Sequence, residues 1–180
     1  FSPTSLKLLK SHKSTKMRRN RNQTLFEFLN NEKTYLNNLK ACYDTFIFSA
    51  KNSKLIPVNS SLYSTFEDFE MILNIHTSFV QQLESDSKDW PVKARITTIF
   101  NDFFPMFKFY HRYAVSFQKV QNQFPKLQDY SEYKELILSK LLPDIRGSLL
   151  DYLVAPLHLF STYEQTVTNL IGFTEKDHVE

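Results

Sequence analysis

One stretch near the start of the chain decides the fold: Glu27-Phe28-Leu29-Asn30-Asn31-Glu32-Lys33-Thr34-Tyr35-Leu36-Asn37-Asn38-Leu39. At about 100° per residue, apolar side chains in and around it share one helix face, namely Leu25, Leu29, Leu36, Leu39, Tyr43, Phe46 and Ile47. Glu32 falls in the middle of this apolar face, whereas Glu27 falls roughly opposite it. The stretch therefore predicts an amphipathic helix with one carboxylate in a core and the other in solvent.

The composition favours helices over sheets. The chain has 2 glycines in 180 residues, fewer than a protein with many tight turns normally needs. Aromatic residues make up 15 % of the chain, and such bulky side chains suit helix-on-helix packing. We predict an all-α fold, an elongated multi-helix bundle with one substantial core.

Apolar runs and cysteine usage indicate the cellular setting. No run approaches the roughly 18 apolar residues that span a bilayer, and no signal peptide is visible. Cys42 is the single cysteine, which excludes an internal disulfide and suits a reducing compartment. We expect a cytoplasmic protein, with recruitment to a membrane or the cytoskeleton left open. Because the chain begins with Phe1, we also expect it to be a piece of a longer protein.

The basic character of the chain is concentrated at its start. Residues 1–22 hold seven of the 22 lysines and arginines and no acid, so residues 23–180 carry a net charge of −4. We interpret residues 1–22 as a basic linker or tail. A solvated linker, attraction to anionic lipid and a nucleic-acid patch remain alternatives for it. The tail lacks the interleaved aromatics that base stacking uses, so we expect no nucleic-acid partner.

Residues 23–180 read as one helical domain interrupted by polar or proline-containing segments. Ser64, with Glu67 three residues later, fits a capping box at the start of the second helix. Prolines break or kink helices because they lack a backbone donor and clash with the preceding turn. The expected helices span 23–50, 64–83, 96–124 with a break at Pro105, 131–142, and 145–173 with a kink at Pro156.

The last helix combines an apolar stripe with a polar one. The expected buried side chains are Leu149, Leu153, Leu157, Phe160, Val167 and Ile171. A second stripe at i, i+4, i+7 and i+11 lies opposite and carries no fixed charge; it consists of His158, Thr162, Gln165 and Asn169.

Motifs for side-chain chemistry are missing from the sequence. Two glycines cannot form a phosphate-binding glycine loop, and no GxSxG elbow occurs. Five histidines never adopt an HExxH or comparable spacing, so we expect no metal. Cys42 lies on the buried flank of the first helix, where a small core residue is expected rather than a nucleophile. We therefore expect neither covalent catalysis nor a cofactor.

Glu32 requires a partner. An unpaired carboxylate among apolar residues costs several kcal/mol. We expect a cation or a hydrogen-bond donor from another helix to meet it.

The stretch from Glu27 to Leu39 resembles the first conserved region of the Dbl-homology domain, the exchange-factor domain that acts on Rho-type GTPases. The matching positions are Glu27, Leu29, Glu32, Tyr35, Leu36 and Leu39, while Asn31 replaces the usual Thr. Similar patterns follow in the family's order over about residues 23–180. They are Leu62 to Phe69 continuing through His76 and Leu83, Ile99-Phe100 with Tyr110 and Tyr113, Leu149 to Tyr163, and Thr174 to His178.

The resemblance implies an elongated helical bundle that binds the switch regions of a Rho-family small GTPase and promotes GDP release. By position, Glu27 would contact switch I, and His158 and Thr162 would stand where the family has a Gln and a basic residue. Leu159 replaces the family's Arg. Gln165 and Asn169 extend the expected contact surface. The structural positions of the first region are Glu32, Tyr35 and Leu39.

The resemblance also sets expectations for the rest of the protein. We expect the domain over residues 23–180 to be incomplete at its C-terminal end, without the family's long last helix, and we expect a pleckstrin-homology domain to follow in the full protein. The replaced charges leave an alternative function open, a catalytically silent helical module that binds cytoskeletal or signalling proteins. A lipid-binding bundle with a basic arm is a third hypothesis.

Overall fold

The protein folds as a bundle of helices. The computed structural model describes residues 3–52, 56–90, 94–127 and 149–174. Within these ranges no strand occurs, which confirms the predicted all-α fold. The helix expected over 131–142 lies outside the described residues.

The described residues form helices of 5 to 40 residues, and three of the junctions between them are single π-helical or 3₁₀ turns. The elements are α1 (Pro3–Cys42), the π-helical turn η1 (Tyr43–Ile47), α2 (Phe48–Asn52), α3 (Ser61–Ser87), α4 (Ile96–Phe103), the 3₁₀ turn η2 (Phe104–Phe107), α5 (Lys108–Leu127), α7 (Leu149–Val154), the 3₁₀ turn η3 (Ala155–His158) and α8 (Leu159–Phe173). Pro105 lies in η2 and Pro156 in η3, so both expected proline breaks are present.

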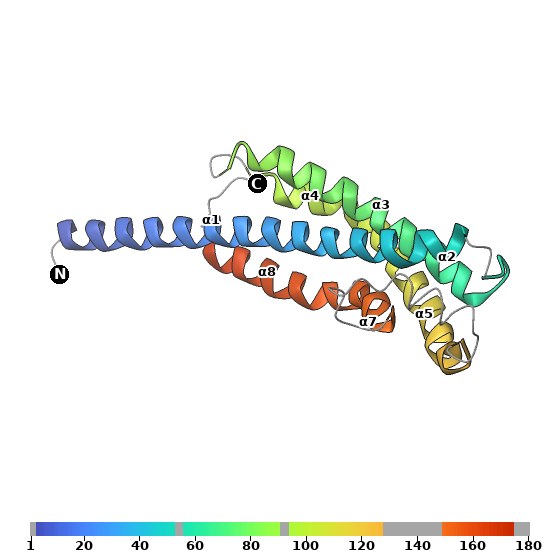
Figure 1. Ribbon diagram of the computed structural model, residues 1–180. Helices are drawn as coiled ribbons and strands as arrows, with labels where there is room; N and C mark the ends of the chain where they lie inside the picture. The colour runs from blue at the N-terminus through green and yellow to red at the C-terminus, as the bar shows by residue number, and fades with distance from the viewer. Residues whose placement is uncertain (1–2, 53–55, 91–93, 128–148, 175–180) are drawn as a thin grey trace.

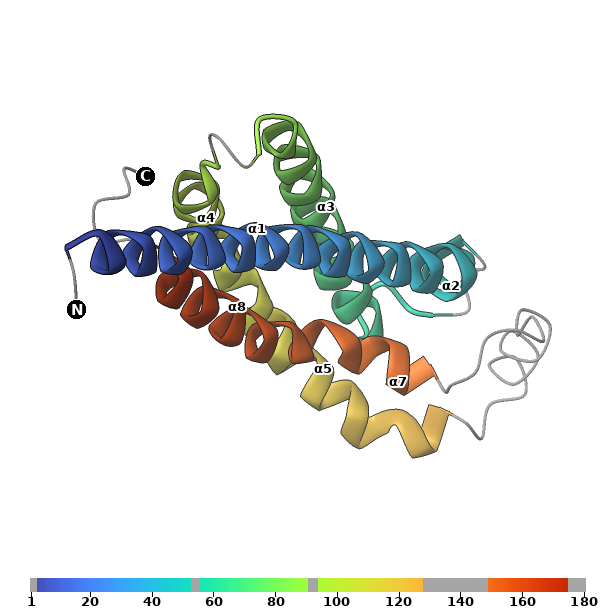
Figure 2. The ribbon, with the colours of Figure 1, turned by 90° about the vertical axis from the view of Figure 1, so that its left-hand side faces the viewer.

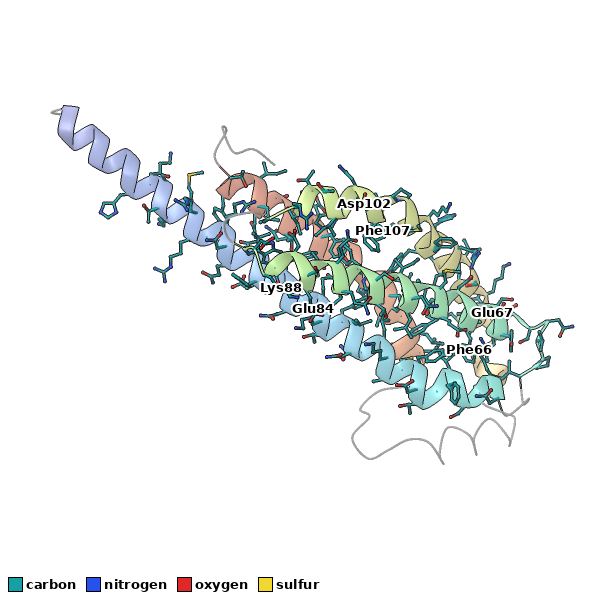
Figure 3. The ribbon with its side chains drawn as sticks, turned by 90° about the horizontal axis from the view of Figure 1, so that it is seen from above. Phe66, Glu67, Glu84, Lys88, Asp102 and Phe107 are labelled. Carbon is teal, nitrogen blue, oxygen red and sulfur yellow. The ribbon has the colours of Figure 1, made fainter. Side chains whose placement is uncertain are left out.

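Helix α1 is the axis of the bundle. Figure 1 shows α3 and α8 on opposite sides of α1, and Figure 2 shows α1 and α8 side by side on the near face with α5 behind them. The N-terminal part of α1 extends beyond the other helices (Figures 1 and 3). The bundle is elongated because α1 is 40 residues long.

The start of α1 corrects the sequence analysis. We expected the first helix to begin near Gln23, but it begins at Pro3 and runs through the basic segment without a break. Lysine, arginine, leucine and methionine are good helix formers, and the segment contains no glycine or internal proline to stop them. The basic segment is therefore a helical extension of the bundle's central helix.

The start of α3 is also earlier than predicted. The helix begins at Ser61, and the hydroxyl of Ser60 accepts a hydrogen bond from the backbone N–H of Tyr63 at 3.2 Å. Ser64, the expected cap, is therefore inside the helix. The earlier start brings Leu62 into the core, where it is buried.

The buried stripe of α8 differs from the predicted one. Val167 and Ile171 are exposed, at 37 % and 71 % of their surface, whereas Leu159, Tyr163 and Leu170 are buried. The 3₁₀ turn η3 explains the change, because its four residues each advance about 120° instead of about 100°. The extra rotation of about 80° turns the inward side of α8 from the predicted stripe to the observed one.

Aromatic side chains fill the centre of the bundle. The Phe79 ring is fully buried and lies 5.8 Å from Phe100 and 6.4 Å from Tyr163, measured between ring centroids. The Tyr113 hydroxyl, also buried, donates a hydrogen bond to the carbonyl of Leu153 and so joins α5 to α7.

Among the described residues, no helix combines the length and apolar character needed to cross a membrane.

Candidate functional site: the face of α1 and α8

Glu27 lies on the outer side of α1. Its neighbours in sequence, about 100° away on either side, both contact other parts of the bundle. The Phe26 ring lies 5.4 Å from Trp90, after α3, and the Phe28 ring lies 5.6 Å from Tyr163 of α8. Glu27 is exposed between these two contacts, and its carboxylate accepts a 2.8 Å hydrogen bond from the Gln23 amide. The carboxylate therefore remains accessible to a partner.

Helix α8 runs antiparallel to α1 (Figures 1 and 2), and one side-chain contact sets their register. The Tyr163 hydroxyl donates a 2.9 Å hydrogen bond to the Glu32 carboxylate. Glu27 is five residues before Glu32, which is about 7 Å along the helix axis. It therefore lies at about the level of residue 168, close to Gln165 and Asn169.

The polar stripe of α8 lies on the surface. His158, Thr162 and Gln165 are exposed, and Asn169 is half-buried. Their angles place them about 100° to 160° around the helix from the buried Tyr163, on the flank and outer side of α8. Glu27 and the stripe thus lie on two helices that contact each other, α1 and α8, and His158 is the stripe residue farthest from Glu27 along the axis.

Hydrogen bonds within α8 engage much of this stripe. The Gln165 amide donates to the Asn169 side-chain oxygen at 3.0 Å, and the Thr162 hydroxyl donates to the Leu159 carbonyl at 2.6 Å. Leu159 itself is buried at 5 % exposure and belongs to the core. The four stripe residues carry no formal charge, so Glu27 is the one formally charged side chain among the five proposed contact residues.

Glu32 lies inside the bundle, and its partners come from two other helices. Besides the Tyr163 hydroxyl of α8, the Nε2 atom of His76 in α3 lies 3.5 Å from the Glu32 carboxylate. The Tyr110 hydroxyl of α5 lies 3.1 Å from Nδ1 of the same imidazole. The half-buried Tyr35 ring packs edge-on against His76, with 4.6 Å between ring centroids. Four helices thus meet around one carboxyl group.

Burial decides the protonation of this cluster. Burial raises the pKa of Glu32 to about 7, and the hydrogen bond from Tyr163 opposes part of the rise. Burial lowers the pKa of His76 to about 3, so the imidazole is neutral at physiological pH. Burial likewise raises the pKa of the Tyr110 and Tyr163 hydroxyls well above their ordinary range. The contact between His76 and Glu32 therefore joins a neutral imidazole to a carboxyl group and is not an ion pair.

Sequence reasoning missed which residues would meet Glu32. It expected a cation or a hydrogen-bond donor from another helix, and a donor, the Tyr163 hydroxyl, is present. Neither His76 nor Tyr163 was assigned that role, although both belong to the motifs of the family resemblance. The signal was one polar residue on the apolar face of each of two helices, Glu32 in α1 and His76 in α3. Pairing them required the register of α1 against α3, and placing Tyr163 required the register of α1 against α8.

Two other expectations concern chemistry and packing. Cys42 is buried, and burial raises the pKa of its thiol to about 12, which leaves it protonated and unreactive. Leu39 is also buried, at 1 % exposure. In the described part of the chain, no three histidine, cysteine or acidic side chains are grouped so as to hold a metal ion.

Comparison with known proteins agrees with this architecture. A family model for the RhoGEF domain matches residues 24–180. The chain is 29 % identical over 184 residues to Rac guanine nucleotide exchange factor JJ of Dictyostelium discoideum, across 97 % of this chain and 15 % of that protein. It is 27 % identical over 176 residues to Ras-specific guanine nucleotide-releasing factor 1 of Homo sapiens, across 90 % of this chain and 13 % of that protein.

A more distant relative is Ras-specific guanine nucleotide-releasing factor 2 of Danio rerio, 24 % identical over 168 residues. The match covers 90 % of this chain and 13 % of that protein, so the chain spans only a small part of each of these relatives. The family model nevertheless covers nearly all of the chain, including α8 and the part of α1 that lies within the bundle. The chain belongs to the RhoGEF, or Dbl-homology, domain family.

Proposed function

We propose that this chain is a guanine-nucleotide exchange factor domain that binds the switch regions of a Rho-family small GTPase and promotes release of GDP. The observation that carries the proposal is the exposed Glu27 on α1, at the position of the family's first-region glutamate and level with the polar stripe of α8. The names of the relatives, which describe exchange or releasing factors for Rac and Ras, support the general activity.

The proposed mechanism is differential binding. An exchange factor accelerates release by binding the nucleotide-free GTPase more tightly than the nucleotide-bound form, so no covalent step is needed. In this proposal Glu27 contacts switch I, and His158, Thr162, Gln165 and Asn169 contact the neighbouring switch surface. The buried cluster around Glu32 holds α1 and α8 in register and so keeps the two halves of the surface together.

The replaced charges favour a weak or selective exchange factor. Thr162 stands where the family has a basic residue, and its hydroxyl already bonds within α8. Replacing a charge-assisted hydrogen bond by a neutral side chain at this position corresponds to about 10- to 150-fold in an equilibrium constant. We therefore expect slower exchange than a family member with the complete motif would give.

The test is release of a fluorescent GDP analogue from a panel of Rho-, Rac- and Ras-type GTPases. The protein should accelerate release from at least one Rho-family member and more than from Ras. The variant that tests the site is Glu27→Ala. Its matched control is Glu67→Ala, which removes an exposed glutamate near the start of α3, at the end of the bundle opposite the projecting part of α1 (Figure 3). Acceleration of no GTPase by the protein within its full-length chain would refute the proposal.

A second candidate function is a silent interaction module on the same face. The internally bonded pair Gln165 and Asn169 and the absence of charge from the stripe favour it. The two candidates differ in one measurement. An exchange factor prefers the nucleotide-free GTPase, whereas a silent module would bind with no such preference or bind other proteins instead.

A further inference from the structure

The N-terminal part of α1 is a solvated helix that projects from the bundle (Figures 1 and 3). Lys13, Lys16, Arg18 and Arg19 are all exposed. Between His12 and the end of the helix, Arg21 is the first buried residue, at 5 % exposure. The helical projection, defined here as residues 12–20, therefore adds little to the core, and its sequence needs another explanation.

The charge of this region is entirely positive. Residues 1–22 contain seven lysines and arginines, and the first acid of the chain is Glu27. Because α1 is helical from Pro3, the charges from Lys7 to Arg21 are spread along about 21 Å, while residues 23–180 carry a net charge of −4. An anionic surface would attract the projection and repel the body, and so orient the molecule.

The charges surround the helix instead of forming a stripe. Lys13, Lys16 and Arg19 are each three residues apart, so each is rotated by about 60° from the last. Within the projection Met17 is the one apolar side chain of any size. Residues 12–20 therefore lack an apolar face that could enter a lipid core or a hydrophobic protein groove.

One side of the helix nevertheless offers grouped hydrogen-bond donors. Thr15, Arg18, Arg19 and Asn22 follow the spacing i, i+3, i+4 and i+7 and line a hollow of about 310 Å³. The guanidinium groups of Arg18 and Arg19 can bind phosphate oxygens through paired hydrogen bonds. This side is suited to the phosphate of a lipid headgroup.

We propose that the helical projection of α1 docks on the phosphate headgroups of an anionic membrane, with Arg18 and Arg19 as its central contacts. Charge complementarity supports this occupant, since juxtamembrane basic clusters bind anionic lipid without apolar insertion. Nucleic acid fits less well, because residues 2–22 contain no Phe, Tyr or Trp on which bases could stack. The proposal does not depend on exchange activity.

The first experiment measures binding to vesicles of phosphatidylcholine with about one-fifth phosphatidylserine, and to pure phosphatidylcholine as reference. The test variant carries Lys13→Gln, Lys16→Gln, Arg18→Gln and Arg19→Gln. The matched control makes the same charge change at four exposed lysines elsewhere, Lys40, Lys88, Lys108 and Lys119. Far-UV circular dichroism checks that both variants remain helical.

The expected result is binding to the anionic vesicles alone, weakened on the order of a hundredfold or more in the projection variant. The control variant should lose much less, within about fivefold. Equal losses in the two variants would mean that only net charge matters and would overturn the proposal. Binding that ignores phosphatidylserine would overturn it as well.

A second experiment tests the headgroup contacts. The double variant Arg18→Lys and Arg19→Lys keeps the charge but loses the paired guanidinium bonds, so binding should weaken several-fold. Unchanged affinity would remove the assigned role of the two arginines. Inorganic phosphate at a concentration equal to that of the lipid should not displace the protein from the vesicles, and duplex DNA of equal charge should bind no more tightly than the vesicles. Displacement by inorganic phosphate, or tighter binding to DNA, would assign the projection to another ligand and overturn the proposal.

Discussion

Helix α1 carries two glutamates in contrasting surroundings, Glu32 in the interior of the bundle and Glu27 on its outer side. Inside the bundle, Glu32 is met by side chains from two other helices and is held at 2 % exposure. Outside, Glu27 accepts its hydrogen bond from Gln23, one turn away on its own helix. The difference teaches that the interior fixes where the helices lie, whereas the outer face keeps its groups accessible to a partner. Substitutions inside should change stability, and substitutions outside should change binding.

The largest effect is expected in the aromatic centre. Phe79→Ala removes a fully buried ring that contacts Phe28, Phe100 and Tyr163, and should lower the free energy of unfolding by about 3–5 kcal/mol. Urea denaturation followed by circular dichroism measures this. Phe104→Ala, at a ring that is 59 % exposed, is the control and should cost about 1 kcal/mol or less. Similar losses in both variants would contradict the division between interior and surface.

The next effect concerns pH and the pair Glu32 and His76. The folded pKa of Glu32 is raised from 4.5 to about 7, so its contribution to stability is full below pH 4.5 and is lost as pH rises through 7. The folded pKa of His76 is lowered from 6.5 to about 3, so its contribution is full above pH 6.5 and is lost as pH falls through 3. Between pH 4.5 and 6.5 the two effects oppose each other and nearly cancel.

Glu32→Gln removes one side of this balance. His76 then acts alone, and the free energy of unfolding should fall by about 2 kcal/mol between pH 6.5 and pH 5, relative to the unchanged protein. His76→Phe should reverse the sign, so that stability rises as pH falls. Urea denaturation at the two pH values measures both variants, and Glu67→Gln on the surface is the control. If the free energy of unfolding changed with pH in parallel for the unchanged protein, Glu32→Gln, His76→Phe and Glu67→Gln, then Glu32 and His76 would not titrate as described.

A smaller effect is expected on the outer face. Glu27→Ala should lower the rate of GDP release about tenfold, equivalent to about 1.4 kcal/mol, because it removes the one charged contact of the proposed surface. Thermal unfolding should stay unchanged, since the side chain is exposed. The assay is nucleotide release from the GTPase found in the panel, with Glu67→Ala alongside. Loss of stability in step with activity would assign Glu27 to the fold.

The smallest effect is expected at the exposed ion pair between α1 and α3. The Lys33 ammonium lies 2.7 Å from the Glu84 carboxylate, but both side chains are nearly half exposed. Lys33→Ala should change the free energy of unfolding by only about 0 to 1 kcal/mol, and less at high salt. A double-mutant cycle with Glu84→Ala measures the coupling. A coupling well above this range would place part of the bundle's stability on its surface.

Much of the fold follows from the sequence because helical periodicity and proline positions report local structure. The apolar face of α1, the break at Pro105 and the kink at Pro156 are of this kind. Three candidate contact residues, Glu27, His158 and Thr162, came instead from a family resemblance, which assigns positions that periodicity alone cannot distinguish from ordinary surface. Gln165 and Asn169 came from the polar stripe that periodicity predicts. What remained out of reach was non-local. The partners of Glu32 depend on the register between α1 and α8, and the exposure of Val167 depends on the geometry of a 3₁₀ turn.

The turn at Pro156 also has a consequence for how relatives are compared. Its extra rotation of about 80° decides which residues of α8 pack against the core and which remain accessible to a partner. A relative that replaced this proline with a helix-continuing residue would align with this chain letter for letter and yet present a different side of α8. One backbone turn thus governs whether aligned surface residues are equivalent in space.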